Sequence, residues 1–134
     1  MTLLCPIRKK EVAATPEERV RASFLTFLIE KGFPKERMVV ERTLAELPHL
    51  IHKPVPERRI DILCYRENFK PLLLVECKVS FSEKHRSQIL GYNHTIEAPF
   101  IVLVSKGYLD LMDSHGSPTP FKEFPNYLEL YHSL

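Results

Sequence analysis

The most constraining feature of this 134-residue chain is an apolar run, residues 72–75, that ends abruptly in charge. The run, LLLV, has no polar face, which is typical of a strand buried on both sides in the middle of a sheet. Glu76 and Lys78 come directly after it. Because a carboxylate and an ammonium at the end of a buried strand cost free energy unless they have partners, the run predicts a polar site there.

A second acid, Asp61, is predicted to lie beside Glu76. It belongs to the strand-like segment 58–65, and a turn near residues 67–68 would fold the chain back on itself. Residues two apart on a strand share a face, so Glu76 and Lys78 would lie on one side, roughly 6.6 Å apart along the strand. Neighbouring carboxylates repel each other unless a cation lies between them, and Mg²⁺ prefers carboxylate oxygens. The pattern therefore predicts a Mg²⁺ or Mn²⁺ site at Asp61 and Glu76, with Lys78 placed to act on a water or a phosphate.

Helices are predicted on both sides of this pair of strands in the sequence. The first covers residues 15–31, with Thr15 as its cap and Glu18 where a capping-box acid belongs. The second covers residues 82–97, with Ser82 as its cap. The remaining expectations are strands at 38–44 and 99–105, a short helix or strand at 108–113, loops at 45–57 and 114–125, and a terminal edge strand at 126–131. A strand, a helix and a strand in succession predict a right-handed parallel crossover.

Composition describes one ordinary soluble domain, residues 1–134. Hydrophobic residues make up 44%, charged residues 27%, and the net charge of +2 does not by itself indicate nucleic acid. No apolar run approaches the roughly 20 residues that span a bilayer, so no membrane association is expected. Three cysteines without CxxC spacing favour a reducing cytoplasm, and six histidines without zinc spacing argue against a zinc site.

Acids and an arginine near the first helix are further candidates. Glu17, on the side of the apolar stripe, and Glu18, well round from it, either compensate the helix dipole or approach the metal site. Arg21 is either a phosphate ligand or a surface charge. Glu41, within the strand at 38–44, is expected to face outward rather than to join the metal site.

Basic residues give the candidate DNA contacts. Residues 1–14 are expected to form a polar arm whose Lys9 and Lys10 are either solvated or in contact with phosphate. Arg59 and Asp61 are two apart on one strand, so they share a face. Arg59 is therefore expected either to pair with Asp61 or to meet a phosphate.

Gln88 and Tyr92 are four residues apart on one face of the second helix. If that face points at the ends of the acid-bearing strands, Gln88 could hold a phosphate or a metal-bound water. Tyr92 could pack beneath Gln88 or touch the backbone. The simpler interpretation is one buried amide and one core tyrosine on an amphipathic helix.

The order Asp61, Glu76-Cys77-Lys78, Gln88 and Tyr92 resembles the D…ExK core and QxxxY element of the RecB-like branch of the PD-(D/E)XK nuclease superfamily. The chain also resembles a closer family, the N-terminal nuclease domain of type I restriction endonuclease R subunits. The similarity runs from Cys5 to about Gly107. It rests on CPIRKK (5–10), TPEERVR (15–21), KGFP (31–34), RRIDI (58–62), PLLLVECK (71–78), and Gln88-Ile89 with Tyr92-Asn93.

The resemblance implies a restriction-endonuclease-like α/β fold with three layers, a central mixed sheet flanked by helices. It implies a metal-dependent DNA phosphodiesterase in which Asp61 and Glu76 bind Mg²⁺, Lys78 serves the attacking water, and Gln88 and Tyr92 complete the site. The acid of the first helix would be Glu17 or Glu18. No GxxxxGK[ST] loop is present, so a motor or specificity subunit would be encoded separately. A homodimer is a further expectation, and a catalytically silent module that binds nucleic acid or a partner protein is the alternative.

Overall fold

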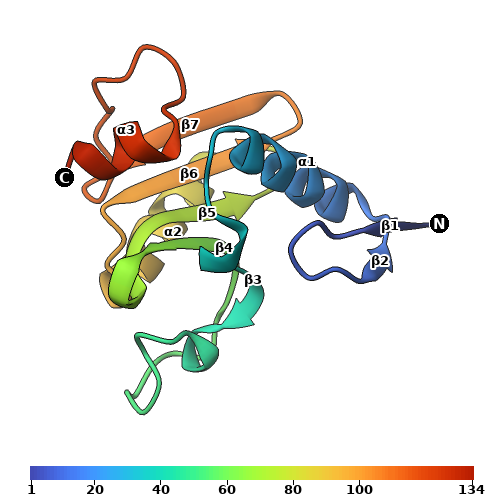
Figure 1. The fold of residues 1–134 in the computed structure, drawn as a ribbon, viewed down its shortest axis with the longest axis horizontal. Helices are drawn as coiled ribbons and strands as arrows, with labels where there is room; N and C mark the ends of the chain where they lie inside the picture. The colour runs from blue at the N-terminus through green and yellow to red at the C-terminus, as the bar shows by residue number, and fades with distance from the viewer.

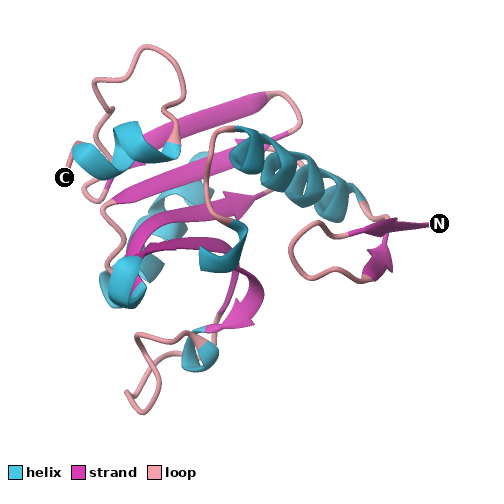
Figure 2. Ribbon diagram, in the orientation of Figure 1, coloured by secondary structure: helices cyan, strands magenta, loops and turns pink.

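A five-stranded mixed sheet lies at the centre of the molecule, with α1 against one face and α2 against the other (Figures 1 and 2). This computed structural model describes residues 1–134. The sheet has the order β3-β4-β5-β6-β7, with bounds Met38–Thr43, Arg59–Arg66, Lys70–Cys77, Phe100–Ser105 and Tyr108–Asp113. The helices are α1 Pro16–Glu30, α2 Glu83–Ile96 and α3 Tyr127–His132, with short 3₁₀ turns at Lys35–Arg37, Leu44–Glu46 and Glu67–Phe69. The predicted three-layer α/β fold is confirmed.

The hairpin β4-β5 forms as expected, with Ile62 opposite Val75 and Leu63 opposite Leu74. Its turn contains Asn68 and Phe69, both with positive φ, at 61° and 53°. Asparagine tolerates that conformation because its short side chain can bond locally, whereas Phe69 is exposed there. The hairpin therefore fixes which residues of β4 and β5 face each other.

The crossover from β5 through α2 to β6 joins parallel strands, with Val75 paired to Val102. β7 then pairs antiparallel with β6, which settles the segment 108–113 as a strand. The apolar run of β5 is fully covered, because one hydrophobic layer lies under α1 and the other under α2. Burial on both faces explains why the run shows no alternation.

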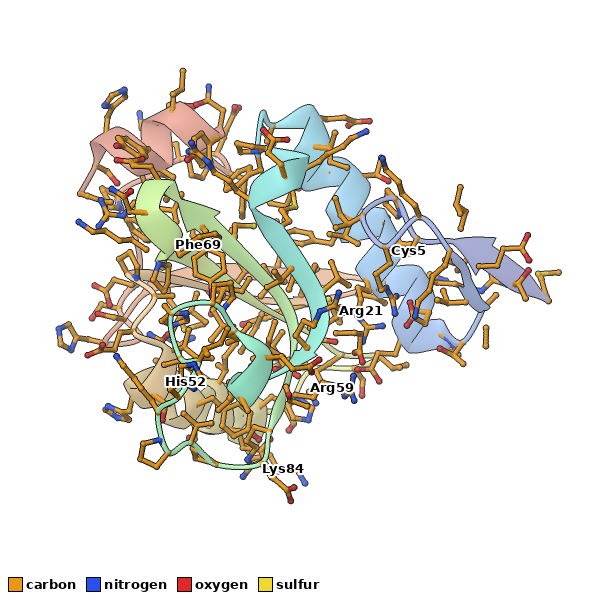
Figure 3. The ribbon with its side chains drawn as sticks, turned by 60° about the horizontal axis from the view of Figure 1, so that its bottom comes forward. Cys5, Arg21, His52, Arg59, Phe69 and Lys84 are labelled. Atoms are coloured by element: carbon orange, nitrogen blue, oxygen red, sulfur yellow. The ribbon has the colours of Figure 1, made fainter.

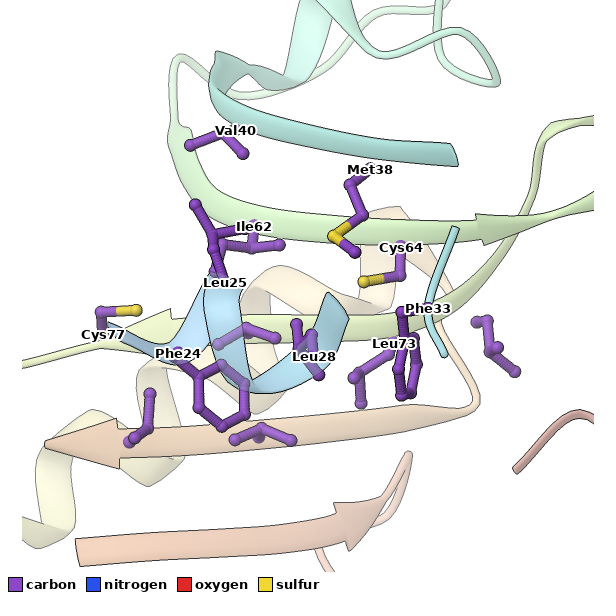
Figure 4. Close-up of a cluster of buried hydrophobic side chains, with 14 of the residues drawn as sticks. Phe24, Leu25, Leu28, Phe33, Met38, Val40, Ile62, Cys64, Leu73 and Cys77 are labelled. Atoms are coloured by element: carbon purple, nitrogen blue, oxygen red, sulfur yellow. The ribbon is translucent and has the colours of Figure 1, made fainter. Parts of the chain in front are cut away.

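Helix α1 covers the sheet with Phe24, Leu25 and Leu28, all buried (Figure 4). Thr15 caps the helix as expected, because its hydroxyl accepts the Glu18 N–H at 3.2 Å. In α2 the Ser82 hydroxyl has no partner, and the helix start is held instead by the Ser82 N–H donating to His85 Nδ1 at 3.2 Å. No helix in the structure is both long and apolar enough to cross a bilayer.

The expected terminal edge strand is wrong, because residues 127–132 form helix α3. Asn126 caps it by accepting the Glu129 N–H at 2.9 Å, and Glu129 returns a bond to the Asn126 N–H. Tyr127 and Leu130, three apart, are buried in the layer under α1, while Leu128 is 61% exposed. A helical period of burial thus replaced the apparent alternation of NYLELY.

The expected polar arm is also wrong in part. Thr2–Leu4 and Glu11–Ala13 form an antiparallel hairpin, β1-β2, separate from the main sheet. Its connection buries Cys5, whose side chain joins the core near α1. Lys9 and Lys10 remain exposed at the end of that connection. The arm is therefore an ordered cover beside α1 with its lysines in solvent.

Candidate active site

Asp61 and Glu76 lie side by side, because each is the next residue beyond the pair Ile62 and Val75 at the end of the β4-β5 ladder. Asp61 is 5% exposed, and its Oδ2 accepts the backbone N–H of Cys77 at 2.9 Å. That bond fixes the Asp61 carboxylate against the end of β5. The geometry expected for the two acids is present.

The pKa of Glu76 is raised to about 8 by burial and by the neighbouring charge of Asp61, while Lys78 opposes the shift. A raised pKa means that a second negative charge beside Asp61 is unfavourable in the protein alone. A divalent cation between the two carboxylates would remove that penalty. Mg²⁺ is commonly held by one or two carboxylates plus waters, so this pair fits it without a third acid. Nowhere in the chain do three or more His, Cys, Asp or Glu side chains converge as a ready-made metal cage.

Lys78 lies beside Glu76, with Nζ 3.4 Å from Oε1. Its backbone N–H donates to the Val104 carbonyl at 2.9 Å, which extends the β5-β6 pairing past the end of the strand. Partial burial lowers the pKa of Lys78, but the charge and hydrogen bond of Glu76 together with the charges of Asp61 and Glu17 outweigh it, and the net shift is upward. Lys78 is therefore an ammonium at neutral pH, suited to stabilising negative charge rather than to accepting a proton.

Arg21 is the main surprise of the site. It is 3% exposed, so it is not the surface charge that the sequence left open. Its guanidinium reaches from α1 to Asp61 Oδ1, with Nε at 3.1 Å and Nη2 in closer contact. It also contacts Glu41 Oε1 at 2.6 Å and Glu18 Oε1 at 2.5 Å, and lies 3.6 Å from Glu17. With its donors committed to carboxylates, Arg21 is not free to meet a phosphate.

Of the two acids of α1, Glu18 and not Glu17 is the more buried, although Glu17 was expected on the side of the apolar stripe. Glu18 is the more buried, at 16% exposure, and accepts from Arg8 at 2.9 Å as well as from Arg21. Glu17 is 47% exposed and reaches only Arg21. Each of these side chains contacts an arginine, and neither contacts Asp61 or Glu76. The apolar periodicity of the helix did not predict this difference in burial, because ion pairs with Arg8 and Arg21 determine where the two carboxylates lie.

Glu41 faces inward, contrary to expectation. The pairings of Val40 with Ile62 and Arg42 with Ile60 set Glu41 opposite Asp61. Its φ of 52° lies in the left-handed region, and its side chain turns to Arg21. Burial, followed by the opposed effects of Arg21 and Asp61, leaves the pKa of Glu41 raised. Glu41 is thus a third acid at the edge of the site.

Arg59 does not pair with Asp61, although they are two apart. Its Nη1 donates to the Glu41 carbonyl at 3.1 Å and lies 3.6 Å from Glu41 Oε2. The Arg59 side chain is 56% exposed, and it lies near Arg21, since both contact Glu41 (Figure 3). Arg59 therefore remains open to solvent beside the acids.

Gln88 and Tyr92 are not the buried pair of the simpler interpretation. Gln88 is exposed, and Tyr92 is half-buried. The Tyr92 hydroxyl accepts from Arg58 Nη1 at 2.7 Å, and the Arg58 guanidinium lies 4.4 Å from the centre of the ring. Arg58 carries no sign of this role in the sequence, since nothing in its neighbourhood ties it to a residue 34 positions away. Tyr92 is thus linked through Arg58 to the residue directly before β4, next to Arg59.

Comparison with known families decides the relationship. Residues 16–125 match the model of the type I restriction enzyme R protein N terminus. The chain belongs to that family. The match covers α1 and the whole five-stranded sheet, and therefore every acid of the candidate site. Membership connects the domain with restriction enzymes, which act on DNA together with other subunits. No curated protein matches this restriction-enzyme domain.

Proposed function

We propose that this R-protein domain is a Mg²⁺-dependent nuclease that hydrolyses DNA phosphodiester bonds. The observation that carries the proposal is the buried pair Asp61 and Glu76, whose mutual repulsion calls for a cation, with the Lys78 ammonium beside it. Family membership supports DNA as the substrate class. Mn²⁺ is expected to substitute, because it has similar oxygen ligands.

The side chains of the site would divide the work as follows. Asp61, held by the Cys77 N–H, and Glu76 would hold the ion. A bound Mg²⁺ would polarise the phosphate and lower the pKa of its water. Lys78, an ammonium at neutral pH, would stabilise charge on the phosphate. Gln88, exposed on α2, and Tyr92, fixed by Arg58, would contact the substrate backbone, and Arg59 with Lys9 and Lys10 would supply cations for neighbouring phosphates.

The test is cleavage of plasmid and linear DNA with Mg²⁺, Mn²⁺ or EDTA. Cleavage is expected with either metal and is expected to vanish with EDTA. Asp61→Asn, Glu76→Gln and Lys78→Gln should each reduce it by about two orders of magnitude or more. Glu123→Gln, a change in the exposed loop before α3, is the matched control and should cleave like the wild type. Circular dichroism of each variant checks that the fold is kept.

A second candidate is a catalytically silent module that binds DNA or a partner protein. The observation in its favour is that Arg21 already neutralises Asp61. In that case wild type and variants would bind DNA equally and none would cleave it with either metal. The same assay therefore separates the two functions.

We further propose a cytoplasmic setting and a motor or specificity subunit as partner. All three cysteines, Cys5, Cys64 and Cys77, are free and buried, which suits a reducing compartment. The family match connects the domain with restriction enzymes that work with other subunits, so a motor or specificity subunit as partner fits the family relation. Co-purification of a motor or specificity subunit with the tagged domain from its source cells is the direct test.

A further inference from the structure

The strongest unexplained feature near the acid pair is the buried guanidinium of Arg21. It is surrounded by four carboxylates, those of Glu17, Glu18, Glu41 and Asp61. Ion pairs that only fasten a helix to a sheet need one partner, and Arg86 with Asp110 is such a pair in this domain. An arginine that gathers four acids next to a fifth, Glu76, neutralises a cluster.

We propose that Arg21 is the resident counter-ion of this cluster and a positioning residue for Asp61, and that a divalent cation has to displace its guanidinium from Asp61 in order to bind. This role of Arg21 rests on the metal site of the proposed function. It implies that the Arg21 charge lowers the affinity of the site for a divalent cation.

Both carboxylate oxygens of Asp61 already have hydrogen-bond donors. Oδ2 is taken by the Cys77 N–H at 2.9 Å, and Oδ1 by two nitrogens of Arg21. A cation that binds Asp61 would share an oxygen with one of these donors. An oxygen that accepts a neutral backbone N–H can also bind a cation. An oxygen that already accepts from a guanidinium would bring the cation and the guanidinium, both positively charged, together in a site that water hardly reaches. Coulomb repulsion at that separation is far above thermal energy when the effective dielectric is about 20.

The second step is that Arg21 has another place to bind. Glu41 Oε1 lies 2.6 Å and Glu18 Oε1 lies 2.5 Å from its terminal nitrogens. If the guanidinium leaves Asp61, these acids keep it paired, so release does not leave an uncompensated buried charge. Asp61 meanwhile stays oriented by the Cys77 N–H. The exchange therefore needs only a small rotation of one side chain.

The decisive measurement is the affinity of the whole domain for Mn²⁺, followed by the free-ion electron paramagnetic resonance signal. Arg21→Met, which keeps the apolar stem and removes the charge, is expected to bind Mn²⁺ at least about tenfold more tightly than the wild type. Arg21→Lys, the conservative variant, should shift affinity in the same direction but less, because one ammonium cannot hold the same set of acids. Arg86→Met, which breaks the ion pair to Asp110, is the matched control and should leave affinity unchanged.

A double-mutant cycle with Glu41→Gln tests whether the effect passes through Arg21. In the wild-type background Glu41→Gln should weaken Mn²⁺ binding, since Arg21 is then held more by Asp61. In the Arg21→Met background the same change should have little effect. An undiminished loss in both backgrounds would make Glu41 a ligand and overturn the exchange.

The remaining outcomes are separable. If wild type binds Mn²⁺ through Asp61 and Glu76, as Asp61→Asn shows, but Arg21→Met binds no more tightly, the inference fails and the metal site stands. If Arg21→Met binds Mn²⁺ more weakly than wild type, the inference also fails, because Arg21 would then only hold the site in shape. If Arg21→Met does not fold, the Arg21→Lys shift decides. If no protein binds Mn²⁺ at these acids, the metal site falls and the inference with it.

Discussion

At the scale of residues, the candidate site is an arrangement of charges in which each carboxylate is set by a neighbour. Asp61 is held by a backbone N–H and by Arg21, whereas Glu76 has only Lys78 as a favourable partner. This asymmetry explains why burial and the charge of Asp61 raise the pKa of Glu76 to about 8. Two acids with different supports can hold one proton between them near neutral pH.

The Glu76 shift predicts a pH dependence of stability without metal. Its pKa is higher in the folded protein than the ordinary 4.5, so proton binding favours the folded state. The contribution is complete below pH 4.5 and is lost as pH rises through 8. Glu76→Gln, measured by thermal melting in EDTA, should therefore become more stable than wild type as pH rises, by an amount on the order of 1–3 kcal/mol.

Mg²⁺ should reverse that difference. An ion held by both carboxylates stabilises the folded wild type by mass action, while Glu76→Gln has lost one of the ligands. The melting temperature of wild type at pH 8 should rise with added Mg²⁺, and that of the variant should rise much less. Equal melting curves for the two proteins across pH 5–9 would contradict the raised pKa.

At the scale of elements, the loop after β3 is fastened by His49. Its Nε2 lies 3.0 Å from the Ile96 carbonyl at the end of α2, and its Nδ1 lies 2.6 Å from the Tyr65 hydroxyl of β4. Because a carbonyl only accepts, Nε2 carries the proton and Nδ1 accepts from Tyr65. Desolvation lowers the pKa of His49, so the neutral ring is the form that joins these three elements.

This predicts an acid-sensitive stability. The folded-state pKa of His49 lies below the unfolded 6.5, so its contribution is complete above pH 6.5 and is lost as pH falls below it. His49→Gln should be less stable than wild type at pH 7.5, by roughly 1 kcal/mol, and should approach wild type near pH 5. Urea denaturation at the two pH values checks this, and a constant difference would contradict it.

Helix α3 makes a second prediction at this scale. On a helix Leu130 points into the core and Leu128 into solvent, with exposures of 0% and 61%. On an edge strand both side chains would lie on one face. Leu130→Ala should cost about 2–5 kcal/mol of unfolding free energy, and Leu128→Ala less than about 0.5 kcal/mol. Equal costs by urea denaturation would indicate a strand instead.

At the scale of the whole molecule, the domain has a single acid pair at one end of its sheet. On the proposed function, one such site would attack one strand of a duplex at a time, so cutting both strands would need two copies or a partner. We therefore predict that supercoiled plasmid gives nicked circles first and that linear product depends on the square of protein concentration. Gel analysis of the products over a concentration series checks this. A protein that elutes as a monomer in size-exclusion chromatography and makes linear DNA without nicked circles would contradict a dimer.

The sequence by itself determined those features of the fold that depend on interactions between residues close together in the chain. The buried run 72–75, the hairpin with its turn, the cap at Thr15 and the crossover through α2 follow from periodicity, turn residues and capping, which act over a few residues. That Asp61 comes close to Glu76 followed too, because a hairpin sets its two strands side by side. The residue-by-residue pairing depends in addition on a register shift between Cys64 and Tyr65, which the sequence did not predict.

Only the tertiary structure decided how the charges pair. Arg21 reaches 40 positions along the chain to Asp61, and Glu41 turns inward through a left-handed backbone rather than by strand alternation. Helix α3 likewise exists because the layer under α1 offers a place for Leu130. Ion pairs over such separations depend on which elements pack together, and a buried charge takes whichever partner the packing supplies. Local pattern carries no information about that choice.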